Sequence, residues 1–223
     1  MKFRDRVDAG RRLGTALKIV RGEAVVVLGL ARGGVPVAAQ VAAALDAPLD
    51  VVVVRKLGVP YQPELAMGAV AEDGIRVIDA EAIRRAGVTA TELAAVETRE
   101  QDEVRQRVAR YRQGRPPASL GGQTAIVVDD GIATGSTARA ACRLARARGA
   151  ARVVLAVPVA PPGWRKRIGG DADTCLALST PDPFYAVGEF YDDFDQVGED
   201  EVIAWLGDCS EAPRAAGRRT PVM

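Results

Sequence analysis

The sequence contains no histidine, only three cysteines and almost no net charge. Without histidine, imidazole is excluded as a general base, as the partner of a nucleophile and as a metal ligand. Cys142, Cys175 and Cys209 lie too far apart for a metal-binding spacing, so we expect free thiols in a reducing cytoplasm. The formal charge of +1 at pH 7 gives the chain as a whole no basic footprint for nucleic acid.

The sequence also lacks a long apolar run and a signal-like N-terminus. No stretch reaches the length of a membrane span, and the first residues are charged. We therefore expect a cytoplasmic protein with neither a membrane nor nucleic acid as a partner. With 223 residues, the chain is long enough for one α/β domain with a substantial core.

The main positive feature is a strand–loop–helix pattern over residues 124–137. Residues 125–128 form a small, mostly β-branched apolar run, which is typical of a buried strand. Asp129 and Asp130 follow directly, and a loop of glycine and hydroxyl residues then leads into a helical pattern.

The loop and the two acids of this pattern favour different ligands. A helix N-terminus has unpaired N–H groups and partial positive charge, so it favours a phosphate, which glycines and hydroxyls help to surround. Two adjacent carboxylates suit hydroxyl groups or a divalent cation instead. Together they indicate a sugar phosphate. A plain turn with capping hydroxyls is the simpler alternative, but it explains neither acid; a P-loop is excluded by the glycine spacing and the missing lysine.

A second strand–loop–helix unit precedes this one. Residues 24–30 form a continuous apolar run, as expected for a central parallel strand, and residues 35–45 have a helical pattern. Between them, Arg32, Gly33 and Gly34 offer a guanidinium and backbone N–H groups to a diphosphate. The glycine spacing does not match the dinucleotide-binding fingerprint. A tight turn is the alternative for this loop taken alone.

Two basic residues follow a third apolar run, residues 49–54. We expect Arg55 and Lys56 in a turn at the carboxyl edge of the sheet, where open α/β sheets bind ligands. Lys56 is the first candidate for a diphosphate contact and Arg55 the second. The alternative is a solvated basic turn.

The segment VVDDGIATGST resembles the loop of type I phosphoribosyltransferases that binds phosphoribosyl diphosphate (PRPP). This resemblance implies that Asp129 and Asp130 hold the ribose 2- and 3-hydroxyls, directly or through Mg, and form the catalytic set with Lys56. It also implies that the 5-phosphate is bound by the residues that follow the acids, which are Gly131, Ile132, Ala133, Thr134, Gly135, Ser136 and Thr137.

The two other loops are similar to parts of the same family. The loop of Arg32, Gly33 and Gly34 resembles its pyrophosphate loop, which often carries a strained or cis peptide just before the glycines. The resemblance implies that these three residues contact the leaving diphosphate. The stretch RKLG-P resembles the basic turn of adenine and orotate phosphoribosyltransferases.

Two segments indicate additions around the sheet. Residues 61–78 suggest a strand pair at the place where the family carries a mobile flap, with Tyr61 and Glu64 expected to close over PRPP. Residues from about 80 to 115 suggest a helical insertion, whose long helix begins at Thr89 with a capping-box pattern. We expect this insertion to pack over the site or to pair with another subunit in a homodimer; a plain surface helix is the alternative.

The N-terminal and C-terminal segments also have recognisable patterns. Residues 1–21 suggest an amphipathic helix with a solvated arginine face that consists of Arg4, Arg6, Arg11 and Arg12. Residues 179–197 hold most of the aromatic residues and resemble the hood of the hypoxanthine-guanine branch. That resemblance implies that Phe184 or Tyr185 stacks on the acceptor base and that Asp192 approaches the metal; an aromatic core cluster is the alternative. We expect residues 208–223 to be a disordered tail.

Strands that alternate with helices predict an α/β fold with a doubly wound parallel sheet, here as one type I phosphoribosyltransferase-like domain over residues 1–207. The resemblance implies transfer of the phosphoribosyl group from PRPP, with Mg, to a nitrogenous acceptor in nucleotide metabolism. Ala133 stands where 6-oxopurine enzymes have an acid near the purine, which disfavours hypoxanthine or guanine. A PRPP- or nucleotide-binding regulator without turnover and a metal-dependent phosphatase or hydrolase are the alternatives.

Overall fold

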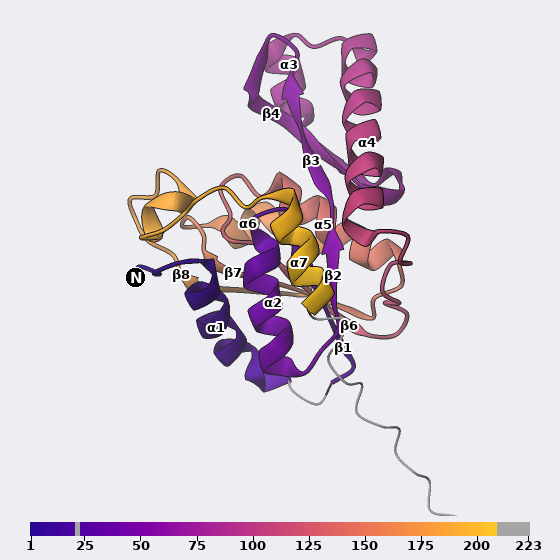
Figure 1. Cartoon of the computed structure of the whole chain (residues 1–223). Coiled ribbons are helices and arrows are strands. Elements are labelled where there is room, and N and C mark those ends of the chain that lie inside the picture. The colour runs from indigo at the N-terminus through magenta and orange to yellow at the C-terminus, as the bar shows by residue number, and fades with distance from the viewer. Residues whose placement is uncertain (21–22, 209–223) are drawn as a thin grey trace, which may run out of the picture.

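Five parallel strands form the central sheet of the computed structural model, which describes residues 1–20 and 23–208 (Figure 1). The strands lie in the order β2-β1-β6-β7-β8, and every neighbouring pair is parallel. Their bounds are β1 Val25–Leu30, β2 Leu49–Val52, β6 Thr124–Val128, β7 Arg152–Val159 and β8 Thr174–Ser179. Every residue of β1 and β6 is buried, which explains their continuous apolar sequence.

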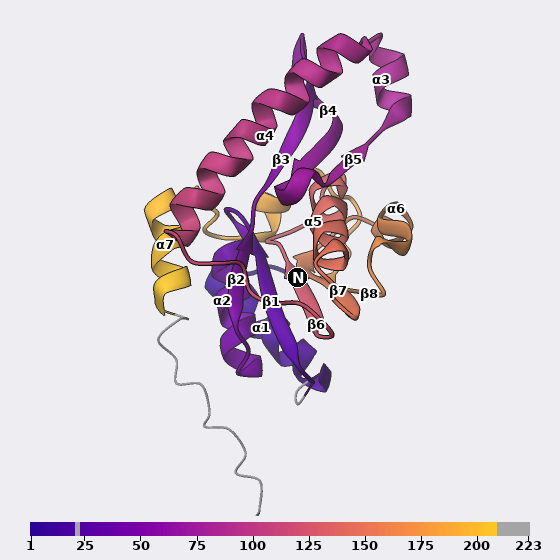
Figure 2. The same cartoon turned by 90° about the vertical axis from the view of Figure 1, so that its right-hand side faces the viewer.

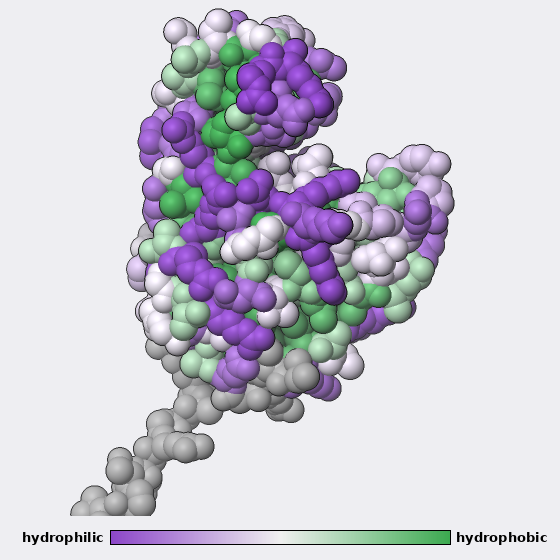
Figure 3. All heavy atoms as spheres, turned by 180° about the vertical axis from the view of Figure 1, so that it is seen from behind, coloured by the Kyte–Doolittle hydropathy of each residue, from purple (hydrophilic) through white to green (hydrophobic). Residues whose placement is uncertain are grey.

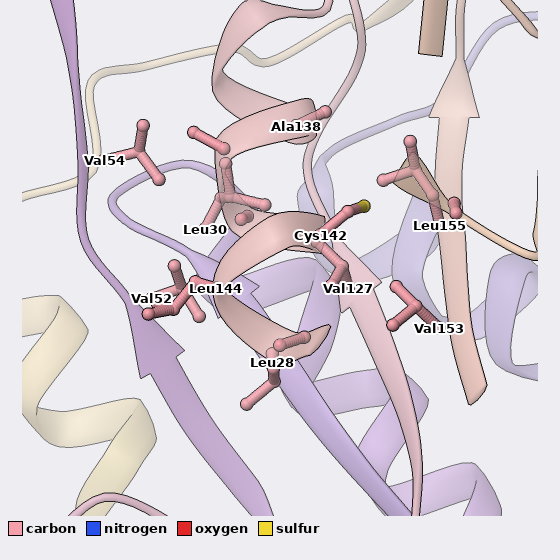
Figure 4. Close-up of a cluster of buried hydrophobic side chains, with 14 of the residues drawn as sticks. Leu28, Leu30, Val52, Val54, Val127, Ala138, Cys142, Leu144, Val153 and Leu155 are labelled. Carbon is pink, nitrogen blue, oxygen red and sulfur yellow. The ribbon is translucent and has the colours of Figure 1, made fainter. Parts of the chain in front are cut away.

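Helices cover both faces of this sheet, so the predicted doubly wound α/β fold is confirmed. The helices are α1 Arg6–Ala16, α2 Gly34–Leu45, α5 Ser136–Ala147, α6 Trp164–Ile168 and α7 Glu199–Asp208. Because strand side chains alternate between the two faces, Val26 and Leu28 pack toward α5, whereas Val25 and Val27 pack toward α1 and α2. Figure 4 shows the α5 face, where Leu144 of the helix lies over the strands.

A second, antiparallel sheet projects from the central one as an arm, residues 54–112 (Figure 2). Its elements are β3 Val54–Val59, β4 Gln62–Ala71, the short 3₁₀ turn η2 Glu72–Gly74, β5 Arg76–Ile78, α3 Ala80–Ala86 and α4 Ala90–Arg112. The strand order is β3-β4-β5. Seen from behind, the arm stands clear of the body, and the outline of the molecule is notched between the two (Figure 3).

The prediction of a basic turn after residues 49–54 is wrong. The central strand β2 ends at Val52, and Arg55 and Lys56 lie inside β3, where they pair with Val70 and Ala69 of β4. The hairpin partner supplies the backbone hydrogen bonds that keep this stretch extended beyond the edge of the central sheet.

The helical insertion is tied to the core through the end of α4. Arg112 donates to Asp50 at 3.2 Å and to Glu72 at 2.6 Å, and its side chain is only 7% exposed. Apolar residues of α4, such as Val96 and Val104, pack in one cluster with strand residues of β2, β3 and β4. The helix α4 therefore packs against the strands of the arm and is fixed to the central sheet at its C-terminal end. The N-terminus of α4 carries the predicted capping box at Thr89.

The N-terminal helix begins later than expected, at Arg6, because the preceding residues pair with the aromatic segment 179–197, called the hood below. Phe3 donates its N–H to Phe190 O at 2.8 Å and accepts from Asp192 N at 2.9 Å. The hood is thus assembled from both ends of the chain, with the 3₁₀ turn η4 (Val187–Phe190) in its middle. The predicted disordered tail lies, from residue 209 onward, outside the described residues.

Candidate active site

Two of the predicted loops meet at the carboxyl edge of the central sheet. β1 and β6 are neighbours, but the chain leaves β1 toward β2 on one side and leaves β6 toward β7 on the other. The loops after such a pair of strands diverge and leave a crevice, which is where open α/β sheets bind ligands. The loops at this point hold Arg32, Gly33 and Gly34 after β1, and residues 129–135 after β6.

The loop after β6 forms an open cup at the start of α5. Gly135 has φ +91°, a left-handed conformation that favours glycine, and no side-chain hydrogen bond caps the helix. Ala133 and Thr134 are exposed, and Ser136 and Thr137 are half-buried. The first N–H groups of α5 are therefore available to an anion, with three hydroxyls nearby. Gly131 and Ile132 are buried and hold the loop, with Ile132 N donating to Val159 O at 3.0 Å.

Asp129 and Asp130 lie side by side in front of this cup. Asp129 Oδ1 accepts the N–H of Asp130 at 2.9 Å, and the Asp130 side chain is 15% exposed. Burial raises the pKa of Asp129 well above its usual value, and the charge of Asp130 adds to this effect. Burial also raises the pKa of Asp130, against the opposing influence of the Arg6 guanidinium. A cation or hydroxyl donors bound here would favour the ionised pair.

Glycine is required where the two loops touch. A Cβ on Gly33 would lie 2.0 Å from Asp130 Oδ2, and one on Gly34 would lie 2.6 Å from Val128 O. The Ala31–Arg32 peptide is cis, as the family resemblance suggested for this position. Arg32 is half-buried at the start of the loop. The structure thus brings Gly33 and Gly34 next to the acid pair.

The two other basic candidates already have partners on the arm. Arg55 Nε donates to Glu100 of α4 at 2.9 Å. Lys56 Nζ donates to the carbonyl of Glu64 across the hairpin and lies 4.0 Å from its carboxylate. Tyr61, also predicted in the flap, is 63% exposed at the tip of this hairpin. The diphosphate contact predicted for Lys56 therefore requires it to exchange partners.

Arg6 contacts the acid pair, which the sequence interpretation missed. It was expected on a solvated face, but its side chain is only 12% exposed, and Nε donates to Asp130 Oδ2 at 2.9 Å. The expectation of a solvated Arg6 is wrong because helix α1 turns this position toward the crevice. Its Nη1 donates to Asp195 O at 2.7 Å, and its guanidinium carbon lies 3.9 Å from the centre of the Phe194 ring.

The aromatic residues of the hood have several different roles. Tyr191 is buried and donates its hydroxyl to Asp130 O at 2.6 Å, and burial raises the pKa of its phenol, which keeps it a donor. Phe184 stacks on Phe190 at 5.3 Å between ring centres, whereas Tyr185 is 80% exposed. Of the two predicted stacking residues, Tyr185 thus has the free ring.

Asp192 does not join the acid pair. Its carboxylate forms an ion pair with Lys2 at 2.6 Å. Over residues 1–20 and 23–208, no three histidine, cysteine or acidic side chains are grouped so that they could hold a metal ion together. The donor set of Asp129 and Asp130 still fits Mg, which commonly binds one or two carboxylates plus the phosphates of a substrate.

Arg167 is a second residue that the sequence interpretation missed. Its exposed side chain reaches from α6 to the loop, where Nη1 donates to Ala133 O at 3.2 Å. The basic run of α6 was visible in the sequence, but its proximity to Ala133 follows only from the packing of α6 beside α5.

Within the described ranges, none of the helices combines the length and apolarity that a membrane crossing requires.

Comparison with known proteins agrees with this geometry. A family model described as the phosphoribosyl transferase domain matches residues 10–195. A Mycobacterium tuberculosis protein provisionally described as a phosphoribosyl transferase is 54% identical over 204 residues, 92% of this chain and 46% of that protein. The chain thus spans about half the length of this curated relative, 46%.

Two further relatives extend the comparison. A solved structure from Thermus thermophilus is 45% identical, with a TM-score of 0.79, and the match covers 93% of this chain and 99% of that one. A stretch of 61 residues, 26% of this chain, is 48% identical to an adenine phosphoribosyltransferase from Kineococcus radiotolerans, of which it covers 33%. The residues matched by the family model include both loops of the crevice, and the chain belongs to the phosphoribosyl transferase domain family.

Proposed function

We propose that this chain is a phosphoribosyltransferase that binds PRPP with Mg, transfers the 5-phosphoribosyl group to a nitrogenous acceptor and releases diphosphate. The observation that carries this proposal is the position of the acid pair at the edge of the sheet. The pair begins the loop after β6 and lies against the loop after β1. The α5 cup faces it on one side, and the loop of Arg32, Gly33 and Gly34 touches it on the other. A phosphate, a pentose and a diphosphate require these features in this order.

Each feature has a separate role in the proposed reaction. The N–H groups and hydroxyls of Thr134, Ser136 and Thr137 bind the 5-phosphate, which leaves the ribose over Asp129 and Asp130. The carboxylates accept hydrogen bonds from the 2- and 3-hydroxyls. Their negative charge stabilises the positive charge that develops at C1 as the bond to diphosphate lengthens.

The proposed transfer is a substitution at C1 of the ribose, and it requires neither an oxidant nor a reductant. The lone pair of an acceptor nitrogen forms the new bond to C1, and the C1–O bond breaks, so that diphosphate leaves with that electron pair. The proton that the acceptor nitrogen loses passes to water or to the released diphosphate. Mg, which the acid pair fits, would neutralise charge on the departing diphosphate. Arg32 and the N–H groups of Gly33 and Gly34 bind the same leaving group.

In this proposal the acceptor is a nitrogenous compound other than a 6-oxopurine. Ala133 provides no carboxylate beside the acceptor. The main-chain carbonyl of Ala133 accepts a hydrogen bond from Arg167. The short similarity to an adenine phosphoribosyltransferase supports a base as acceptor. Tyr185, with its exposed ring, is the stacking candidate in the hood.

A PRPP-binding regulator without turnover is the second candidate, and one observation favours it. Both cations of β3 are engaged within the arm, Arg55 by Glu100 and Lys56 by Glu64. A site in which Arg32 is the cation for the diphosphate, without help from β3, would retain affinity for PRPP and lose the reaction.

One assay separates the two candidates. The protein is incubated with PRPP, Mg and a panel of nucleobases and amines, and released diphosphate is measured. We expect release with one acceptor class, and we expect the double variant Asp129→Asn with Asp130→Asn to lose PRPP binding but keep its fold by circular dichroism. Tight PRPP binding without release across a broad panel would favour the regulator. Unchanged PRPP affinity of the double variant would refute the assignment of the site.

A further inference from the structure

Arg6 lies where three parts of the site meet. Its Nε is 2.9 Å from Asp130 Oδ2, in the loop after β6. A Cβ placed on Gly33, in the loop after β1, would lie 3.2 Å from the same nitrogen. Its Nη1 is 2.7 Å from Asp195 O in the hood, and Phe194 lies under its guanidinium. One side chain from the N-terminal helix thus contacts the loop after β6 and the hood and lies near Gly33 of the loop after β1.

These contacts differ from an ordinary surface ion pair. The side chains of Arg6 and Asp130 are 12% and 15% exposed, so water screens their attraction less than it screens an exposed pair. The guanidinium is planar and offers several N–H groups in fixed directions, so two of them can donate to different acceptors at once. A lysine could keep the charge contact with Asp130 but could not donate to Asp195 O at the same time, so it should replace Arg6 only in part.

The contact also fixes how the Asp130 carboxylate is oriented. Oδ2 is turned toward Arg6 and toward the Gly33 side, whereas Tyr191 holds the main-chain carbonyl of the same residue at 2.6 Å. Oδ2 and the main-chain carbonyl of Asp130 are both held, so the carboxylate has a fixed orientation toward a ribose hydroxyl. A residue that contacts a ligand-binding side chain from behind can fix the orientation of that side chain in this way.

We propose that Arg6 is a positioning residue of the ribose site, which holds Asp130 in its binding orientation and links it to the hood. This inference rests on the proposed function, since it assigns Asp130 to the ribose. Arg6 acts through Asp130 and Phe194 and does not itself touch the ligand. The N-terminal segment is then part of the binding site and not only of the scaffold.

The test compares three ligands by isothermal titration calorimetry in the presence of Mg. PRPP and ribose 5-phosphate contain the ribose, and diphosphate does not. We expect Arg6→Met to weaken both ribose ligands by about tenfold to hundredfold, the size expected when a hydrogen bond to a charged group is lost. Diphosphate should change by no more than about twofold. Arg11→Met is the matched control, because Arg11 lies on the same helix with an exposed side chain and contacts Gln40.

The outcomes are distinct. Equal weakening of all three ligands by Arg6→Met would overturn the inference in favour of a general structural role, and so would an effect no larger than that of Arg11→Met. If Arg6→Met lowers the melting temperature, Arg6→Lys decides: a ribose affinity between those of the wild type and the methionine variant supports positioning, and no recovery overturns it. A wild-type protein that binds neither PRPP nor ribose 5-phosphate overturns the proposed function itself.

Discussion

At the scale of single residues, Gly33 is the position where added size should interfere most directly with ligand binding. A methyl group there would overlap Asp130 Oδ2, at 2.0 Å, so the carboxylate must move away from its place beside Arg6. The overlap is with a side chain and not with backbone, so the fold should survive. We predict that Gly33→Ala weakens ribose 5-phosphate binding roughly five- to hundredfold, from an overpacking cost of about 1–3 kcal/mol.

The measurement is a calorimetric titration with ribose 5-phosphate, together with the urea midpoint of unfolding. Gly170→Ala is the control, because a Cβ at Gly170 has no atom within 4 Å and its backbone is not left-handed. An affinity of Gly33→Ala that matches the control would mean that Asp130 can shift without any loss to the ligand.

At the scale of elements, Asp171 joins α5 to the 3₁₀ turn η3 (Gly169–Asp171). It accepts from Arg139 Nε at 2.7 Å and from Arg143 Nε at 2.8 Å. Burial alone would raise the pKa of Asp171, but the hydrogen bonds from Arg143 and Arg139 outweigh burial and lower it below 3.8. The unfolded chain therefore binds this proton more readily than the folded protein does.

The sign of the pH dependence follows from that difference. The ion pairs stabilise the fold above the unfolded pKa, and this stabilisation is lost as pH falls through the lowered folded pKa. We predict that Asp171→Asn lowers the free energy of unfolding by about 1 kcal/mol at pH 7 and that its deficit against the wild type shrinks toward pH 3. Urea unfolding at both pH values checks this. Asp102→Asn, in an exposed pair on α4, should change little at either pH, and a deficit of Asp171→Asn that grows on acidification would contradict the prediction.

The elements that the sequence predicted correctly are those whose pattern is local. β1 and residues 125–128 of β6 are apolar because both faces of the sheet are covered, and the loop after β6 leads into α5 at Ser136 as its glycine and hydroxyl residues predicted. The stretch with Arg55 and Lys56 was mistaken for a turn, since basic residues after an apolar run are typical of a loop. Its strand depends on β4, which pairs with it from the other side of the hairpin. A local pattern contains no information about that partner.

At the scale of the whole molecule, the predicted part of the candidate site has a local sequence pattern, and the missed part depends on contacts between distant segments. Asp129, Asp130 and the loop after them form one contiguous motif, and β1–β6 pairing brings Gly33 to them. Arg6 and Tyr191 come from opposite ends of the chain and meet Asp130 only because the N-terminal segment pairs with the hood. No spacing of residues in the sequence predicts these contacts with Asp130.

The hood packs with α1 and the end of β7 in a small hydrophobic cluster. Phe3, Ala9, Val159 and Tyr191 are its buried members, and the rings of Phe3 and Tyr191 lie 5.4 Å apart. Phe3 is fully buried, so it is the largest contribution that the first five residues make to packing. Loss of this ring should loosen the hood while the clusters on either side of β1 and β6 keep their contacts.

We therefore predict that Phe3→Ala acts locally, at a cost of about 3–5 kcal/mol to the packing of the hood. Amide hydrogen exchange should speed up over residues 184–194 and at Gly131, whose N–H shares a peptide group with the Asp130 carbonyl that Tyr191 holds. It should stay unchanged in β1 and β6. Leu13→Ala, which opens a cavity between α1 and α2, is the control and should raise exchange in those helices instead. If Phe3→Ala raised exchange evenly over the central sheet, the hood would unfold only with the whole domain, and the N-terminal segment could not act on the ribose site separately.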